Sequence, residues 1–220
     1  MNNQKAFIFD LDGVIVDTAK FHFKAWKKLA NDLGFDFSEA QNEQLKGVSR
    51  AASLNKILAW GDMELSEDEF NKQMALKNEN YLSYVDTMDE KDILPGVSKV
   101  IDYLIEKDIP FALGSASKNA RNILKKVNLF DKFHAIVDGN DVTKAKPDPE
   151  VFLIAAEKLK ASAGNCVVFE DSLAGIQAAN IAKMISIGIG DDSILSEADH
   201  NFKDFTEVEI SFINNLLKEA

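Results

Sequence analysis

The sequence predicts an α/β protein: a doubly wound parallel sheet with a small helical domain inserted after its first strand. Three observations predict it. Short runs that are apolar at every position recur along the chain, as expected of strands covered by helices on both faces. Amphipathic segments with helical spacing accompany the later runs. The first run is followed by a long, almost purely helical block.

The predicted strands are the five apolar runs at 6–9, 111–113, 135–137, 167–169 and 184–187. The amphipathic segments at 97–105, 123–127, 151–159 and 176–181 are the predicted helices of the sheet domain. Alternation of this kind is typical of a sheet wound by helices on both sides.

The helical block contains four predicted helices, at 19–33, 38–46, 50–60 and 66–84. Gly34 and Gly47 end the first two, and Ser66 with Glu69 forms a capping box at the start of the fourth. Four consecutive helices exceed one crossover connection. We therefore expect residues 16–88 to form an inserted cap domain, and residues 1–15 and 89–220 to form the core domain.

Composition limits the function classes. The chain has 220 residues, 46% of them hydrophobic, and a net charge of −11. This size fits a core domain with a smaller one added. The acidic balance argues against a nucleic-acid partner, but a small phosphorylated substrate needs only a few placed cations. No run reaches membrane-spanning length, so we expect a cytoplasmic protein without a membrane partner. We also expect a monomer. The single cysteine, Cys166, is expected to be a buried strand residue rather than a reactive thiol.

Polar residues stand at the carboxyl ends of the predicted strands, where open α/β sheets place their ligands. They are Asp10 with Asp12, Ser115, Lys146, and Glu170 with Asp171. Each has a simpler reading: a turn at Asp-Leu-Asp-Gly, a helix cap at Ser115, a solvated loop cation at Lys146, and helix-start charge at Glu170-Asp171. Their occurrence at equivalent places on successive strands favours one shared site.

Together these residues suit phosphoryl transfer. Asp10 can attack phosphorus and form an aspartyl-phosphate, and Asp12 can act as general acid and base. Ser115 and Lys146 can bind the non-bridging phosphoryl oxygens. Glu170 and Asp171, with Asp10 and Asp12, offer the oxygen ligands that one Mg²⁺ prefers.

With this pattern the chain resembles the haloacid dehalogenase (HAD) superfamily of aspartate-nucleophile phosphotransferases. The resemblance covers essentially the full length and implies a HAD-like Rossmannoid core with a helical cap after the first strand. In the superfamily a DxD pair, a Ser or Thr, a Lys and an acidic pair have the roles described above. The segment 138–145 carries no pattern that predicts a role.

The cap is similar to that of the sugar-phosphate mutases of this superfamily in the stretches 17–26, 44–50 and 77–81, as is 115–119 in the core. The resemblance implies conversion of β-D-glucose 1-phosphate and D-glucose 6-phosphate into each other through glucose 1,6-bisphosphate. Substrate-binding residues would be Thr18, His22, Lys46, Gly47, Val48, Arg50, Lys77, Ser115, Ala116, Ser117, Lys118, Asn119 and Lys146.

Within this set, Arg50, Ser117, Lys118 and Asn119 can hold a second, non-reacting phosphate. The resemblance also implies that His22 and Lys77 orient Asp12; a packed histidine and a solvated lysine stay open as alternatives. Two rival functions stay open: a HAD-type sugar-phosphate phosphatase, and a non-catalytic phospho-sugar sensor. Retention of both Asp10 and Asp12 weighs against the sensor.

Overall fold

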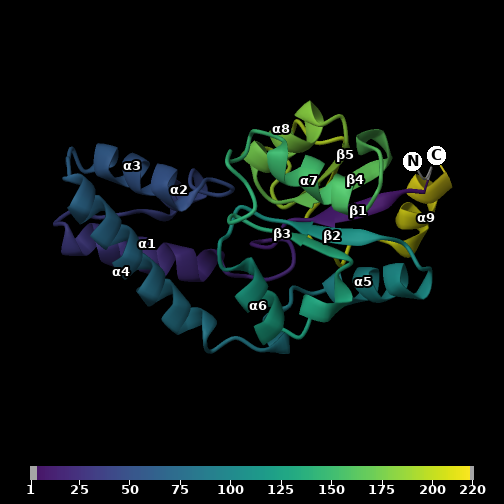
Figure 1. The fold of residues 1–220 in the computed structure, drawn as a ribbon, viewed down its shortest axis with the longest axis horizontal. Coiled ribbons are helices and arrows are strands. Elements are labelled where there is room, and N and C mark those ends of the chain that lie inside the picture. The colour runs from purple at the N-terminus through teal and green to yellow at the C-terminus, as the bar shows by residue number, and fades with distance from the viewer. Residues whose placement is uncertain (1–3, 219–220) are drawn as a thin grey trace.

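The computed structural model describes residues 4–218 and contains a six-stranded parallel sheet with helices on both faces (Figure 1). The strands are β1 (Ala6–Phe9), β2 (Phe111–Gly114), β3 (Ala135–Val137), β4 (Cys166–Glu170), β5 (Ile185–Ile189) and β6 (His200–Phe202). Their order is β3-β2-β1-β4-β5-β6. Because the order reverses direction at β1, the sheet is doubly wound, and the predicted fold class is confirmed.

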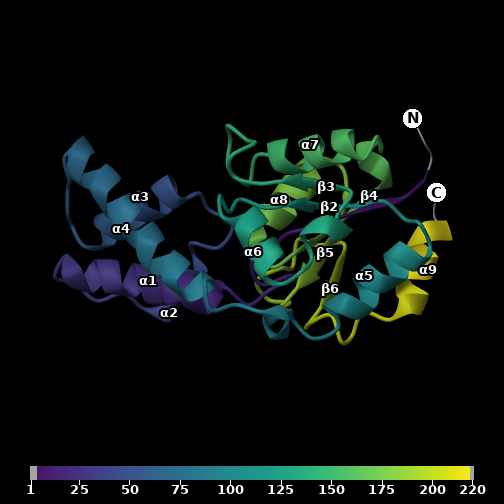
Figure 2. The same cartoon turned by 60° about the horizontal axis from the view of Figure 1, so that its bottom comes forward.

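Helices cover both faces of the sheet because both faces of its strands are apolar. The helices are α5 (Val97–Glu106), α6 (Ala120–Lys126), α7 (Glu150–Lys158), α8 (Leu173–Ile181) and α9 (Ile210–Lys218). Ala6 and Ile8 of β1 pack with α7 and α8, whereas Phe7 and Phe9 pack with α5, α6 and α9. Figures 1 and 2 show these two helical layers on opposite sides of the sheet.

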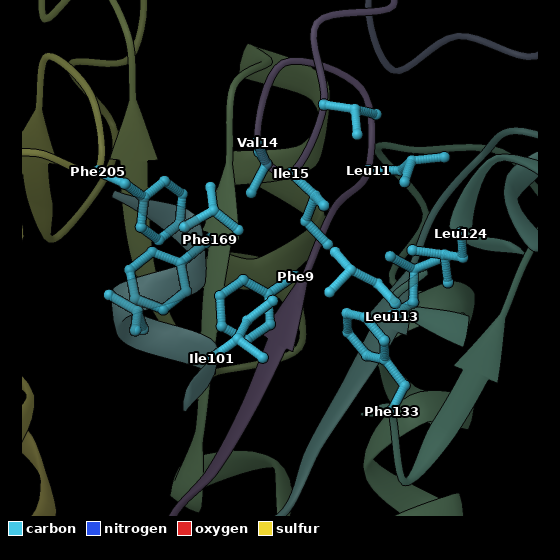
Figure 3. Packing of buried hydrophobic residues seen from close by; sticks show 14 of the residues in the cluster. Phe9, Leu11, Val14, Ile15, Ile101, Leu113, Leu124, Phe133, Phe169 and Phe205 are labelled. Carbon is cyan, nitrogen blue, oxygen red and sulfur yellow. The ribbon is translucent and has the colours of Figure 1, made fainter. Parts of the chain in front are cut away.

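The larger of the two cores is rich in phenylalanine. Figure 3 shows Phe9 between Phe169 and Phe133, with Ile101 of α5 beside them. The rings of Phe9 and Phe169 stack with centroids 5.0 Å apart. This packing fixes β1 and β4 side by side, and both strands end at the polar residues singled out by the sequence.

Four further helices lie beyond the carboxyl ends of the strands, at the left of Figure 1. They are α1 (Ala19–Asp32), α2 (Glu39–Glu43), α3 (Arg50–Trp60) and α4 (Glu67–Val85). Three of them, α1, α3 and α4, share a core of their own, which includes Trp26, Leu54 and Ile57. Ser66 and Glu69 form the expected capping box at the start of α4. A helical cap inserted after the first strand is therefore present.

Some predicted elements are wrong in their extent. The helix predicted over 38–46 ends at Glu43, because the chain turns toward Gly47, whose φ is +70°. The strand predicted over 184–187 runs instead from Ile185 to Ile189. β6 and α9 were not predicted. Short 3-10 helices occur at Glu90–Asp92, Phe130–Lys132 and Ala163–Asn165. None of the helices within residues 4–218 combines the length and apolar character needed to cross a bilayer.

Candidate active site

The polar residues at the strand ends meet in one cavity of about 440 Å³, which opens between the sheet and the four cap helices. Asp10 and Asp12 follow β1, Ser115 follows β2, and Asp171 follows β4. Parallel strands end at the same edge of a sheet, so residues distant in sequence converge there.

Lys146 joins two of the acidic residues. Its ammonium donates to Asp10 Oδ1 at 2.6 Å, to Glu170 Oε2 at 2.8 Å and to the Gly114 carbonyl at 3.2 Å. Burial alone would lower the pKa of Lys146, but the two carboxylates raise it, so the side chain stays charged. Because it is buried and has three hydrogen-bond acceptors, Lys146 belongs to the site and is not a solvated loop cation.

The carboxylates of Asp10, Glu170 and Asp171 form a compact group whose ligand oxygens lie within 4.8 Å of one another. Burial, and then the neighbouring negative charges, hold the pKa of Asp10 well above its usual range despite the Lys146 ammonium. Burial likewise raises the pKa of Asp171 to about 7. Three converging oxygen ligands in a buried, charge-rich pocket fit a divalent cation such as Mg²⁺.

Asp12 has different neighbours. Its Oδ1 accepts a hydrogen bond from the buried Thr18 hydroxyl and lies 4.0 Å from His22 Nε2. Burial raises the pKa of Asp12, so this carboxyl can hold a proton more readily than a solvated aspartate. Its carboxylate lies outside the compact acidic group, so its assignment as a metal ligand stays a prediction.

A histidine and a lysine from two cap helices stand next to Asp12. Lys77 Nζ lies 2.8 Å from His22 Nδ1 and 4.4 Å from the Trp26 ring centroid. Burial, and then the charges of Lys77 and Arg50, keep the pKa of His22 well below its usual value. Burial, followed by the charge of Arg50, lowers the pKa of Lys77 to about 7. A neutral imidazole can therefore accept a hydrogen bond from the Lys77 ammonium.

The cap also reaches the acidic group through the turn before α3. Lys46 Nζ lies 3.3 Å from Asp171 Oδ2 and 2.9 Å from Glu43 Oε1. A Cβ on Gly47 would stand only 2.6 Å from Ser172 Oγ, so a glycine permits this close approach of cap and core. The Lys46–Asp171 ion pair links the two parts of the molecule at the cavity.

Most of the sequence-predicted site residues line the cavity. They are Asp10, Asp12, His22, Lys46, Gly47, Val48, Arg50, Lys77, Ser115, Ala116, Ser117, Lys118, Asn119, Lys146 and Asp171. Thr18 and Glu170 are not among the lining residues, but each contacts one that is: Thr18 contacts Asp12, and Glu170 contacts Lys146. Ser115 is no helix cap, because α6 begins five residues later and Ser115 Oγ accepts from the Ser117 amide.

One lining segment was missed by sequence reasoning: the loop at 138–145. Gly139 packs against the 115–119 loop, where a Cβ would stand 2.4 Å from the Ala116 carbonyl oxygen. Its amide donates to the Ser117 carbonyl at 3.3 Å. Arg121 forms ion pairs with Asp138 and Asp141 and so fixes the loop. The Asp-Gly-Asn-Asp composition after a strand end was the available signal.

Comparisons with known proteins agree with this geometry. The sequence profile of the haloacid dehalogenase-like hydrolases matches residues 4–183. A Bacillus subtilis protein named beta-phosphoglucomutase is 42% identical over 197 residues, which cover 89% of this chain and 87% of the relative. A crystal structure of a beta-phosphoglucomutase from Clostridium difficile is 40% identical and matches with a TM-score of 0.94 over 98% of both chains. A Thermotoga maritima protein named phosphorylated carbohydrates phosphatase is 30% identical over 180 residues, 81% of each chain.

Proposed function

The chain belongs to the haloacid dehalogenase-like hydrolase family, and from this premise we propose that it interconverts β-D-glucose 1-phosphate and D-glucose 6-phosphate. The intermediate is β-glucose 1,6-bisphosphate. One observation carries the proposal: the cavity is lined both by the nucleophile Asp10 and by the cation Arg50, which shares the acceptor Asn78 with Asn119. A phosphatase needs the nucleophile but not a second cation for a non-transferring phosphate. The relatives named beta-phosphoglucomutase support the same reaction.

The reaction begins with the phosphoryl group on Asp10. The 6-hydroxyl of β-glucose 1-phosphate attacks this phosphorus while Asp12 accepts the hydroxyl proton, and the bond from phosphorus to Asp10 breaks. The bisphosphate then turns over in the site. Asp10 attacks the phosphorus on O1, Asp12 returns its proton to O1, and glucose 6-phosphate leaves. The raised pKa of Asp12 suits a group that must hold a proton between the two half-reactions.

Charge on the transferring phosphoryl group is balanced by this chain's own residues and by a metal. Lys146, 2.6 Å from Asp10, is placed to bind a non-bridging oxygen, and Ser115 lines the same part of the cavity. Asp10, Glu170 and Asp171 would hold one Mg²⁺. When bound, Mg²⁺ supplies positive charge that stabilises the transferring phosphoryl group.

The cap gives the mutase its advantage over hydrolysis. We assign residues 16–88 to the cap and residues 1–15 and 89–220 to the core. His22 and Lys77 come from the cap and meet Asp12 of the core, so Asp12 is fully oriented only while the cap is closed. Closure also keeps water away from the aspartyl-phosphate, so that a sugar hydroxyl and not water attacks it.

A coupled assay tests this function. With Mg²⁺ and a trace of glucose 1,6-bisphosphate, the protein should convert β-glucose 1-phosphate into glucose 6-phosphate, read through glucose-6-phosphate dehydrogenase, with little free phosphate. The α-anomer should be a poor substrate. Arg50→Ala should lower the rate sharply, because it removes binding energy remote from the reacting phosphorus. Phosphate release that keeps pace with substrate loss, with no effect of Arg50→Ala, would mark a phosphatase, and no turnover of any phosphate ester would mark a sensor.

A further inference from the structure

A half-buried asparagine on α4 joins two residues of the proposed distal phosphate site. Asn78 Oδ1 accepts a hydrogen bond from Arg50 Nη2 at 2.7 Å and a second from Asn119 Nδ2 at 3.0 Å. Arg50 is the first residue of α3 in the cap, and Asn119 directly precedes α6 in the core. A single carboxamide oxygen therefore holds a cap residue and a core residue together.

Asn78 stands behind these two residues and not in the cavity. Arg50 and Asn119 are among the residues that line the cavity, whereas Asn78 is absent from its lining within the described part of the chain. Both donors also present further N–H groups, since a guanidinium has five and a carboxamide two. Asn78 can thus fix each donor through one N–H while the others stay available to a phosphate.

The chemistry of the carboxamide suits this position. An oxygen acceptor without net charge orients the Arg50 guanidinium but does not neutralise it, so the positive charge remains for the ligand. An aspartate here would cancel that charge and repel a phosphate. The preceding residue, Lys77, contacts His22 beside Asp12. Two adjacent residues of α4 therefore support residues that line the cavity: Lys77 contacts His22, and Asn78 contacts Arg50 and Asn119.

We propose that Asn78 is a positioning residue for the non-transferring phosphate: it holds Arg50 and Asn119 at the separation that this phosphate requires. The inference rests on the proposed function, because a mutase must hold a non-transferring phosphate while the other phosphoryl group reacts. Its role is in binding and orientation. Loss of Asn78 should therefore raise KM more than it lowers kcat.

Two substitutions test the role. Asn78→Ala removes the acceptor, and Asn78→Leu removes it while keeping a side chain of similar size. Each should raise KM for β-glucose 1-phosphate about tenfold, the expected effect of losing one charge-assisted hydrogen bond that orients a ligand. The matched control is Asn80→Ala, two residues further along α4, which should behave as wild type. Thermal unfolding of all variants checks that each protein is folded.

A double-mutant cycle shows whether Asn78 acts through Arg50. Adding Asn78→Ala to Arg50→Ala should raise KM by less than threefold, since the charged residue that Asn78 orients is already gone and only the neutral Asn119 contact remains. Tenfold effects that multiply in the double variant would overturn the inference, as would folded Asn78 variants with the KM of the Asn80 control. If wild type itself makes no glucose 6-phosphate, the proposed function fails and the inference falls with it. An active wild type with unaffected Asn78 variants overturns the inference alone.

Discussion

Lys77→Met should change how stability depends on pH. Lys77 is 2% exposed, and its ammonium lies over the Trp26 ring. Burial, and then the charge of Arg50, lowers its pKa from 10.5 to about 7. Methionine has a similar shape without a charge, so the substitution removes the titration and keeps most of the packing.

The sign follows from proton binding. Below about pH 7 Lys77 is charged in both the folded and the unfolded states, and the folded state bears the full cost of the buried charge. Between pH 7 and 10.5 the unfolded chain binds more protons than the folded one, so the free energy of unfolding rises with pH. From pH 6 to pH 9 this rise is about 2–3 kcal/mol in wild type. The methionine variant lacks it.

Urea unfolding at pH 6 and pH 9 measures the effect. The stability of Lys77→Met relative to wild type should be about 2–3 kcal/mol greater at pH 6 than at pH 9. Asp171, whose pKa is also near 7, is present in both proteins and cancels in the comparison. Mutase activity should fall, because Lys77 no longer supports His22 beside Asp12. Lys72→Met, an exposed position of α4, is the control. A stability difference that is the same at both pH values would refute the reasoning.

Three further predictions concern single residues. Asp10→Asn should stay folded yet lose at least about a thousandfold in turnover in the coupled assay, because an amide is a poor nucleophile; near-normal activity would end the mechanism. Asp171→Ala should weaken Mg²⁺ binding at least tenfold by calorimetry, and full wild-type activity in excess chelator would contradict a metal role. Ser66→Ala should lower the free energy of unfolding in urea by about 1 kcal/mol, because it removes the capping box at the start of α4. Unchanged stability would show that this capping box contributes nothing.

The strand ends could be predicted because their signals are local. Ala6–Phe9 is apolar at every position, and Asp10 and Asp12 come directly after it. One short stretch of sequence therefore predicts both the strand and the reactive residues at its end. The buried thiol of Cys166 follows from the same logic, and burial raises its pKa to about 11. By contrast, β6 is an edge strand that contains the exposed His200 and the partly exposed Asn201, and its sequence lacks an apolar run.

Other features depend on contacts between distant residues. Asn78 has no signal of its own, because its partners Arg50 and Asn119 are 28 and 41 residues away. The role of the 138–145 loop is equally non-local, since it depends on the contact of Gly139 with Ala116. Spacing along one chain does not reveal which turn of a cap helix faces which loop of the core. The folded arrangement supplies that information.

The transfer of one labelled phosphoryl group tests the central claim most directly. Asp10 is first labelled with ³²P from acetyl phosphate in the presence of Mg²⁺, and β-glucose 1-phosphate is then added in a rapid-quench experiment. If the protein is the proposed mutase, most of the label moves to glucose 1,6-bisphosphate within one turnover, and little appears as inorganic phosphate. Label that appears mainly as inorganic phosphate, at a rate that the sugar phosphate does not change, would contradict the proposal.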